Sequence, residues 1–147
     1  MRTIVAVAAM LVAAVTGAEA QMNASELKWG PAPPAFPAGA EMAVLSGDPG
    51  KAGPFAVRLR VPAGFKVPAH SHPTDEFVTV ISGDISLGMG DKLDPAMGKK
   101  LEAGGFAQAK AGMNHYVWTG SGAVVQVNGD GPFDMTYANP ADDPRKK

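Results

Sequence analysis

Turn-forming residues interrupt this chain about every ten residues and leave only short hydrophobic runs between them. Glycine occurs 18 times and proline 13 times among the 147 residues, both above average usage. From Pro54 to Val61, hydrophobic residues alternate with Arg58 and Arg60, which is the two-residue period of a half-buried strand. No amphipathic helical pattern is evident. The sequence therefore predicts a single all-β domain, either a sandwich or a small barrel.

The same reasoning places about eight or nine short strands along the chain. A histidine-bearing strand is expected after the turn at 62–64. The segments 76–81 and 85–89 are expected to form a hairpin around Ser82-Gly83-Asp84, and a polar surface loop is expected at 91–100. The remaining strands are expected within residues 41–46, 101–109, 113–118, 123–128 and 133–137.

Composition and charge exclude several classes of function. Hydrophobic residues make up 46% of the chain, enough for a core, whereas charged residues make up 18% and the formal net charge is −1. A nucleic-acid-binding domain would need a basic surplus or a basic patch, so we expect no nucleic-acid partner. The absence of cysteine excludes disulfides and thiolate chemistry.

The first twenty residues have the pattern of a secretory signal peptide. Arg2 supplies the positive start, residues 4–15 are an almost unbroken apolar run, and Ala18-Glu19-Ala20 matches the small-x-small pattern before a cleavage site. The alternative is a retained membrane anchor, but the apolar run is shorter than the ~20 residues that a span needs. We therefore expect a periplasmic or secreted protein without a membrane anchor.

Three parts are expected after the signal peptide. Residues 21–40 form an extended proline-rich arm, anchored by Trp29 and Phe36, which lies over the domain or crosses to a second subunit. Residues 41–138 form the folded domain. Residues 139–147 form a flexible polar tail.

Two histidines two residues apart, His70 and His72, mark the stretch that carries the most chemistry. Side chains at positions i and i+2 of a strand face the same side, so the two imidazoles are expected side by side with Glu76 just beyond them. His115, the third histidine of the chain, follows a glycine-marked turn into another expected strand. Three neutral imidazoles and one carboxylate suit a first-row divalent ion. Asp75 is the alternative carboxylate.

These residues resemble the two sequence motifs of the cupin superfamily. The first motif combines glycine, H-x-H, glutamate and glycine at fixed spacings, and the chain matches every position with Gly64, His70, His72, Glu76 and Gly83. The second motif is matched by Gly104, Gly112 and His115, whereas Lys110 replaces its proline and Thr119 its asparagine. The two departures affect turn and strand-end positions, not ligands.

The resemblance implies a jelly-roll β-barrel in which His70, His72, Glu76 and His115 bind one divalent first-row transition metal. Iron and manganese are the metals it implies first, with zinc, nickel and copper as alternatives. The chain also resembles small exported cupins of the ChrR-like group. Because small cupins often pair through an edge strand, we expect a homodimer, with residues 41–46 as a candidate edge.

Four protein ligands on an octahedral ion leave about two positions for water, substrate or dioxygen. We therefore favour a metal-dependent enzyme, dioxygenase-like or acting through Lewis-acid polarisation, on a small chelating molecule such as an enol, carboxylate or catechol. The alternative is a non-enzymatic module that binds or senses a small molecule, and a third possibility is a purely structural metal. The sequence identifies no separate catalytic acid, base or nucleophile.

The alternation of side chains between the two faces of a strand, together with residue type, assigns other side chains to the interior or the surface. Arg58 and Arg60 are expected to point outward, with the mouth of the barrel as the alternative. Gln126 and Asn128 are left open between an exposed amide and a polar contact to substrate. Val78, Val80 and Val117 are expected inside because they lie on the same face of their strands as the candidate ligands. The scattered methionines Met89, Met113 and Met135 are expected to fill the core.

Overall fold

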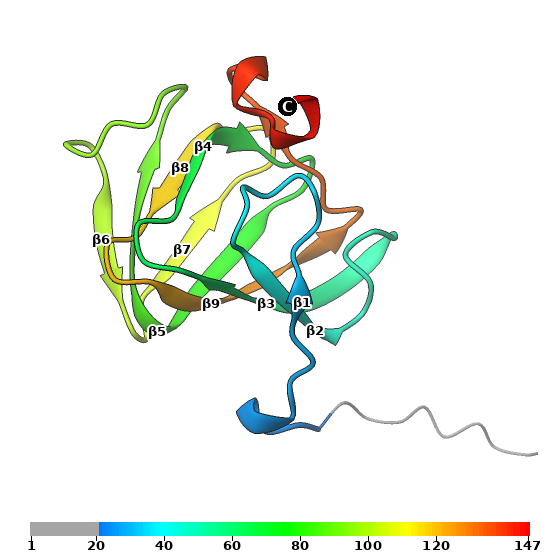
Figure 1. Ribbon diagram of the computed structural model, residues 1–147. Coiled ribbons are helices and arrows are strands. Elements are labelled where there is room, and N and C mark those ends of the chain that lie inside the picture. Colours follow the sequence, from blue (N-terminus) through cyan, green and yellow to red (C-terminus); the bar gives the residue numbers. More distant parts are fainter. Residues whose placement is uncertain (1–20) are drawn as a thin grey trace, which may run out of the picture.

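Antiparallel strands curl around a common interior in the computed structural model, which describes residues 21–147 (Figure 1). The strands are β1 (Gly30–Pro31), β2 (Glu41–Ser46), β3 (Gly53–Val61), β4 (Lys66–Ser71), β5 (Glu76–Met89), β6 (Lys99–Glu102), β7 (Phe106–Ala109), β8 (His115–Trp118), β9 (Ala123–Gly131) and β10 (Thr136–Tyr137). The short 3₁₀ turns are η1 (Ala24–Glu26), η2 (Pro140–Asp142) and η3 (Pro144–Lys146). The all-β jelly-roll barrel predicted from the sequence is confirmed.

Strands that are distant in sequence lie side by side in this barrel. The order of hydrogen-bonded neighbours is β1-β2-β3-β9-β5-β8-β4-β10, and β6 and β7 also pair with β5. The pairs β3–β9 and β4–β8 are joined by long crossing connections rather than by hairpins. As a result, the strands that carry His70 and His115 are direct neighbours.

The predicted hairpin around Ser82-Gly83-Asp84 is wrong, because β5 runs without reversal through all three residues. Its first half pairs with β9 and β7 and its second half with β6 and β8, so the strand passes from one sheet into the other. The register with β9 shifts between Val80 and Ser82, and Gly83 has a φ of 71°. The apparent turn signal is a bulge at a corner of the barrel.

The interior is filled by alternate residues of the strands, as the two-residue period predicts. One cluster of buried residues comprises Phe55, Val57, Leu59, Val78, Val80, Ile85, Ala123, Val125 and Val127. A second comprises Ala40, Phe65, Val67, Met135 and Tyr137. The expectation that Met89 and Met113 fill the core is wrong, since they are 45% and 48% exposed. Met89 ends β5, and Met113 lies in the turn before β8.

The outer face of the barrel takes the polar side chains of β3 and β9. Arg60 Nε donates to Glu41 Oε2 at 2.7 Å, and its guanidinium lies 4.4 Å from the centre of the Trp29 ring. Arg58 Nε donates to Gln126 Oε1 at 3.3 Å. Both arginines therefore point outward, as favoured from the sequence.

The two ends of the described chain pack against the barrel. Phe36 of the proline-rich arm packs against both core clusters. At the other end, Arg145 donates from Nη2 to the Met135 carbonyl at 2.8 Å and from Nε to Asp143 at 2.9 Å. The sequence prediction of a flexible tail did not include these contacts.

Among residues 21–147 there is no helix with the length and apolar character needed to cross a membrane. The predicted signal peptide, residues 1–20, lies outside the described residues.

Candidate metal centre

Three neighbouring segments bring the predicted ligands together. His70 lies on β4, His72 directly follows that strand, Glu76 opens β5, and His115 opens β8. The β4–β8 register places His70 opposite His115. The Gly112 amide donates to the His72 carbonyl at 2.9 Å, which fixes the turn before His115 against the H-x-H segment.

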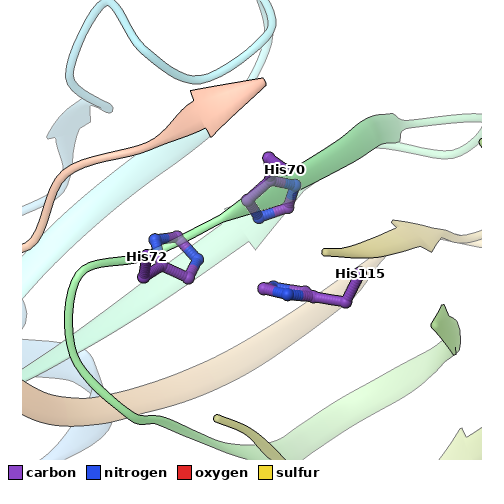
Figure 2. Close-up of side chains that lie close together, drawn as sticks. All are labelled: His70, His72 and His115. Atoms are coloured by element: carbon purple, nitrogen blue, oxygen red, sulfur yellow. The ribbon is translucent and has the colours of Figure 1, made fainter. Parts of the chain in front are cut away.

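The three imidazole rings face a common point (Figure 2). Their centroids are 4.3 Å apart for His70 and His115, 4.9 Å for His70 and His72, and 5.2 Å for His72 and His115. One ring nitrogen from each lies within 4.8 Å of the others, and the three side chains are only 1–4% exposed. Three buried histidines can therefore hold one metal ion.

The Glu76 carboxylate lies against two of the three histidines. Its Oε2 atom lies 3.2 Å from His115 Nε2 and 3.5 Å from His72 Nε2, and the residue is 8% exposed. The alternative carboxylate, Asp75, is engaged elsewhere: it accepts hydrogen bonds from the Ala111 amide at 2.8 Å and from Gln108 Nε2 at 2.9 Å. Asp75 thus stabilises the turn before β8 and does not join the cluster.

Each histidine is oriented by a backbone carbonyl at its Nδ1 atom. The distances are 2.8 Å from His70 to Pro68 O, 2.7 Å from His72 to Asp134 O, and 3.0 Å from His115 to Met113 O. A carbonyl can only accept a hydrogen bond, so each Nδ1 carries the proton. In the neutral ring, each Nε2 then presents a lone pair, which is the form that binds a metal.

The surroundings of the Nε2 atoms test whether a metal ion fits the site. Those of His72 and His115 are buried and have no hydrogen-bond partner among the described residues. The Glu76 carboxylate lies within 3.5 Å of both atoms and also presents only lone pairs when ionised. A cation between these atoms would satisfy the lone pairs of the neutral rings and of the carboxylate, so the donor set fits a divalent metal ion.

Burial and mutual contact shift the protonation of these groups. Burial, reinforced by the rings of His115 and His72, lowers the pKa of His70 to about 3. Burial alone would raise the pKa of Glu76, but the contacts with His115 and His72 outweigh it and hold that pKa below its usual range. Burial opposes protonation of His115, yet the Glu76 carboxylate raises its pKa. The cluster thus favours an ionised carboxylate surrounded by imidazoles.

Aromatic side chains that the sequence did not single out support the imidazoles from behind. The Phe133 ring stacks on His72 with centroids 4.1 Å apart and planes 20° from parallel. The Tyr137 ring lies 5.9 Å from His70, which it faces across the β10–β4 pair. Both residues belong to the segment after the predicted motifs, and no motif spacing points to them.

A narrow cavity of about 60 Å³ opens beside the cluster. Its wall is formed by Phe36, Leu59, Val61, Phe65, Val67, His70, His72, Glu76, Val78, Ile85, His115, Val117, Trp118, Thr119, Val125 and Val127. The inward orientation predicted for Val78 and Val117 is confirmed, and Val80 lies in the adjoining core. Gln126 Nε2 donates a hydrogen bond to Asn128 Oδ1 at 3.3 Å, and neither residue lines the cavity. Of the two roles considered for these amides, the structure therefore favours the outer face over a contact with substrate.

Solved structures similar to this chain share its barrel. The polyketide cyclase RemF from Streptomyces resistomycificus matches with a TM-score of 0.69 at 15% identity, covering 86% of this chain and 89% of that chain. A putative acetylacetone dioxygenase from Methylibium petroleiphilum matches with a TM-score of 0.64 at 22% identity, covering 86% and 85%. An RmlC-like cupin from Shewanella frigidimarina matches with a TM-score of 0.61 at 15% identity, covering 76% and 90%. At these identities the likeness establishes the cupin fold.

No curated protein sequence matches the chain. Residues 16–136 match the protein family described as "Domain of unknown function (DUF4437)". That range includes both predicted motifs and all four residues of the cluster. The chain therefore belongs to the DUF4437 family and has the cupin fold.

Proposed function

We propose that the protein is a metal-dependent cupin enzyme acting on a small chelating molecule. His70, His72, Glu76 and His115 are proposed to hold one divalent first-row metal, with iron or manganese favoured. The observation that carries this proposal is the pair of buried Nε2 lone pairs that face a carboxylate without any hydrogen-bond partner. When bound, such a metal supplies Lewis-acid polarisation or dioxygen chemistry at the ligand positions that the protein leaves open.

The chain's own residues would orient the reactants and exclude water. The carbonyls at Nδ1 hold the imidazoles in one tautomer and one direction. The apolar wall keeps bulk water from the cavity. Glu76 is the one carboxylate among the lining residues, so proton transfer inside the cavity would involve its oxygens.

The test is metal analysis followed by turnover of the loaded protein. A tag-free chain is required, because a histidine tag would add ligands to a protein that has three histidines. We expect one metal per chain in the wild type, its loss in His115→Ala, and oxygen uptake or conversion of a 1,3-diketone or enolic acid by the iron- or manganese-loaded protein. Full metal retention in His115→Ala would contradict the site. A metal-loaded protein that converts none of these substrates would contradict the proposal that the protein is an enzyme.

A binding or sensing module without catalysis is the second candidate. It is favoured by the composition of the cavity wall, where the cluster itself supplies every titratable side chain and no separate acid, base or nucleophile is added. Tight binding of a chelating ligand to the metal-loaded protein without any conversion would favour this candidate.

The proposed site of action is the periplasm or the cell exterior, on the basis of the signal-peptide pattern in residues 1–20. A homodimer and the relationship to ChrR-like cupins are likewise proposals that rest on the sequence resemblance. Cell fractionation tests the location, and the native molar mass in solution tests the homodimer.

A further inference from the structure

The ionisable side chains in the wall of the cavity beside the metal centre all belong to the histidine–glutamate cluster. Its wall includes no lysine, arginine or aspartate. Arg58 and Arg60, the nearest candidates in sequence, are directed to the outer face. The other lining residues with polar side-chain atoms, Trp118 and Thr119, are uncharged, and the Thr119 hydroxyl accepts a hydrogen bond from the Gly122 amide at 3.0 Å. A ligand therefore finds one place for a charged head and an uncharged, mainly apolar surface elsewhere.

This distribution of polarity selects against a second charged group on the ligand. An ionised carboxylate placed against valine, leucine and phenylalanine loses its hydration and gains no partner. A bound metal can take one chelating head, but it cannot compensate a charge at the other end of the molecule. An uncharged apolar body is the chemistry that matches this wall.

Phe36 is the one lining residue that comes from the N-terminal arm rather than from the barrel and its loops. It lies on the loop 32–40, which connects β1 to β2. The loop is closed at its base by the Ala32 amide, which donates to the Ala40 carbonyl at 3.0 Å, and internally by the Phe36 amide, which donates to Pro33 O at 2.9 Å. The arm therefore supplies a formed part of the cavity wall.

Tyr137 connects this loop to the metal centre. Its hydroxyl donates to the Ala35 carbonyl at 2.7 Å, directly beside Phe36, and its backbone pairs with His70. This hydrogen bond ties the loop that carries Phe36 to the strand pair that carries His70. A cavity of about 60 Å³ bounded in this way admits only a compact ligand.

We infer that the ligand of this pocket is a compact molecule with one bidentate oxygen head and an uncharged apolar body, and that the Phe36 ring limits the size of that body. The inference rests on the proposed function, because the head is held by the proposed metal. It adds the class of ligand and the residue that selects it.

Three probes that present two oxygens in the same six-membered chelate separate charge from size. Acetylacetone has small apolar ends, malonate carries a second charge, and benzoylacetone has a larger apolar body. Binding is measured from the visible absorption of the tag-free, Co²⁺-loaded full chain, with dialysis confirming that cobalt stays on the protein. Each affinity is divided by that of the same probe for free Co²⁺ in the same buffer, which removes the intrinsic chelate strength.

We expect the normalised affinity for acetylacetone to exceed that for malonate by at least about tenfold, because the uncoordinated carboxylate oxygens of malonate would lie against the apolar wall where acetylacetone places methyl groups. Benzoylacetone is expected to bind at least about tenfold more weakly than acetylacetone in the wild type. Phe36→Ala should remove most of that second difference. Phe36→Leu, which retains apolar packing, should have an intermediate effect and covers the case in which the alanine variant fails to fold. The matched control is Phe106→Ala, a residue 58% exposed on β7 and outside the cavity wall, which should leave all three affinities unchanged.

A normalised affinity for malonate equal to that for acetylacetone would overturn the ligand class. An unchanged ratio between acetylacetone and benzoylacetone in both Phe36 variants would overturn the role of Phe36. Either result, obtained with cobalt bound, leaves the proposed metal centre standing. Failure to bind cobalt at all would instead overturn the proposed function and this inference together.

Discussion

At the scale of single residues, the chemistry of the site depends on which imidazole nitrogen carries the proton. For His70 and His115, the carbonyl that accepts from Nδ1 belongs to the residue two positions earlier, Pro68 and Met113. Backbone shape alone therefore fixes these two tautomers. His72 relies on a distant carbonyl, that of Asp134, whose side chain in turn pairs with Arg145 at 3.2 Å. The tail of the chain thus contacts the segment that orients one proposed ligand.

Removing the charge of Glu76 tests the carboxylate. We expect Glu76→Gln to weaken Zn²⁺ binding at least about tenfold. In known sites, loss of a residue that only hydrogen-bonds to a metal ligand already lowers metal affinity about 10–100-fold. Competition against a chromophoric zinc indicator measures the affinity. Glu102→Gln is the matched control, since Glu102 is an exposed carboxylate that forms an ion pair with Lys100. Equal zinc affinity for the two variants would show that Glu76 is not a ligand.

At the scale of elements, the corner in β5 explains how one strand serves both sheets. Gly83 has a positive φ, and a Cβ atom there would lie 2.2 Å from the Gly122 carbonyl oxygen. Gly64, in the turn before β4, has a similar φ of 76°, but a Cβ atom there would meet no other atom within 4 Å. An alanine at Gly64 would therefore suffer only the strain of a positive φ, whereas an alanine at Gly83 would also clash with the backbone.

Chemical denaturation of two alanine variants measures this difference. Gly64→Ala should lower the free energy of unfolding by about 1–2 kcal/mol, the cost of a left-handed residue with a side chain. Gly83→Ala should cost at least about 1 kcal/mol more, because the backbone must also move to accommodate the methyl group. If both variants lose the same stability, the close crossing at the β5 corner is not a constraint on the fold.

At the scale of the whole molecule, the residues that carry motifs were predictable and the contacts between distant segments were not. The H-x-H pair, Glu76 and His115 were identified from spacing, and the structure places the three histidines together, with Glu76 beside His72 and His115. The hairpin at Gly83 was mispredicted because a glycine flanked by serine and aspartate has the same local pattern in a reversal and in a bulge. Only pairing with both sheets distinguishes them.

The cavity wall shows the same limit of sequence-based prediction. The alternation of side chains along a strand was enough to predict that Val78 and Val117 face inward. Phe36 and Phe133 lie in irregular segments, where no periodicity relates sequence position to direction. Their contacts with the cavity and with His72 arise from the path of the chain across the barrel.

The central claim is that all three histidines of the chain bind one metal through Nε2. Long-range ¹H–¹⁵N correlation spectra of the tag-free protein, labelled with ¹⁵N-histidine, observe every imidazole nitrogen directly. The account predicts Nδ1–H on all three rings in the zinc-bound protein and a shift of all three Nε2 resonances that is complete at one equivalent of Zn²⁺. Coordination through an Nδ1 atom, or an Nε2 resonance that does not respond to zinc, would contradict it.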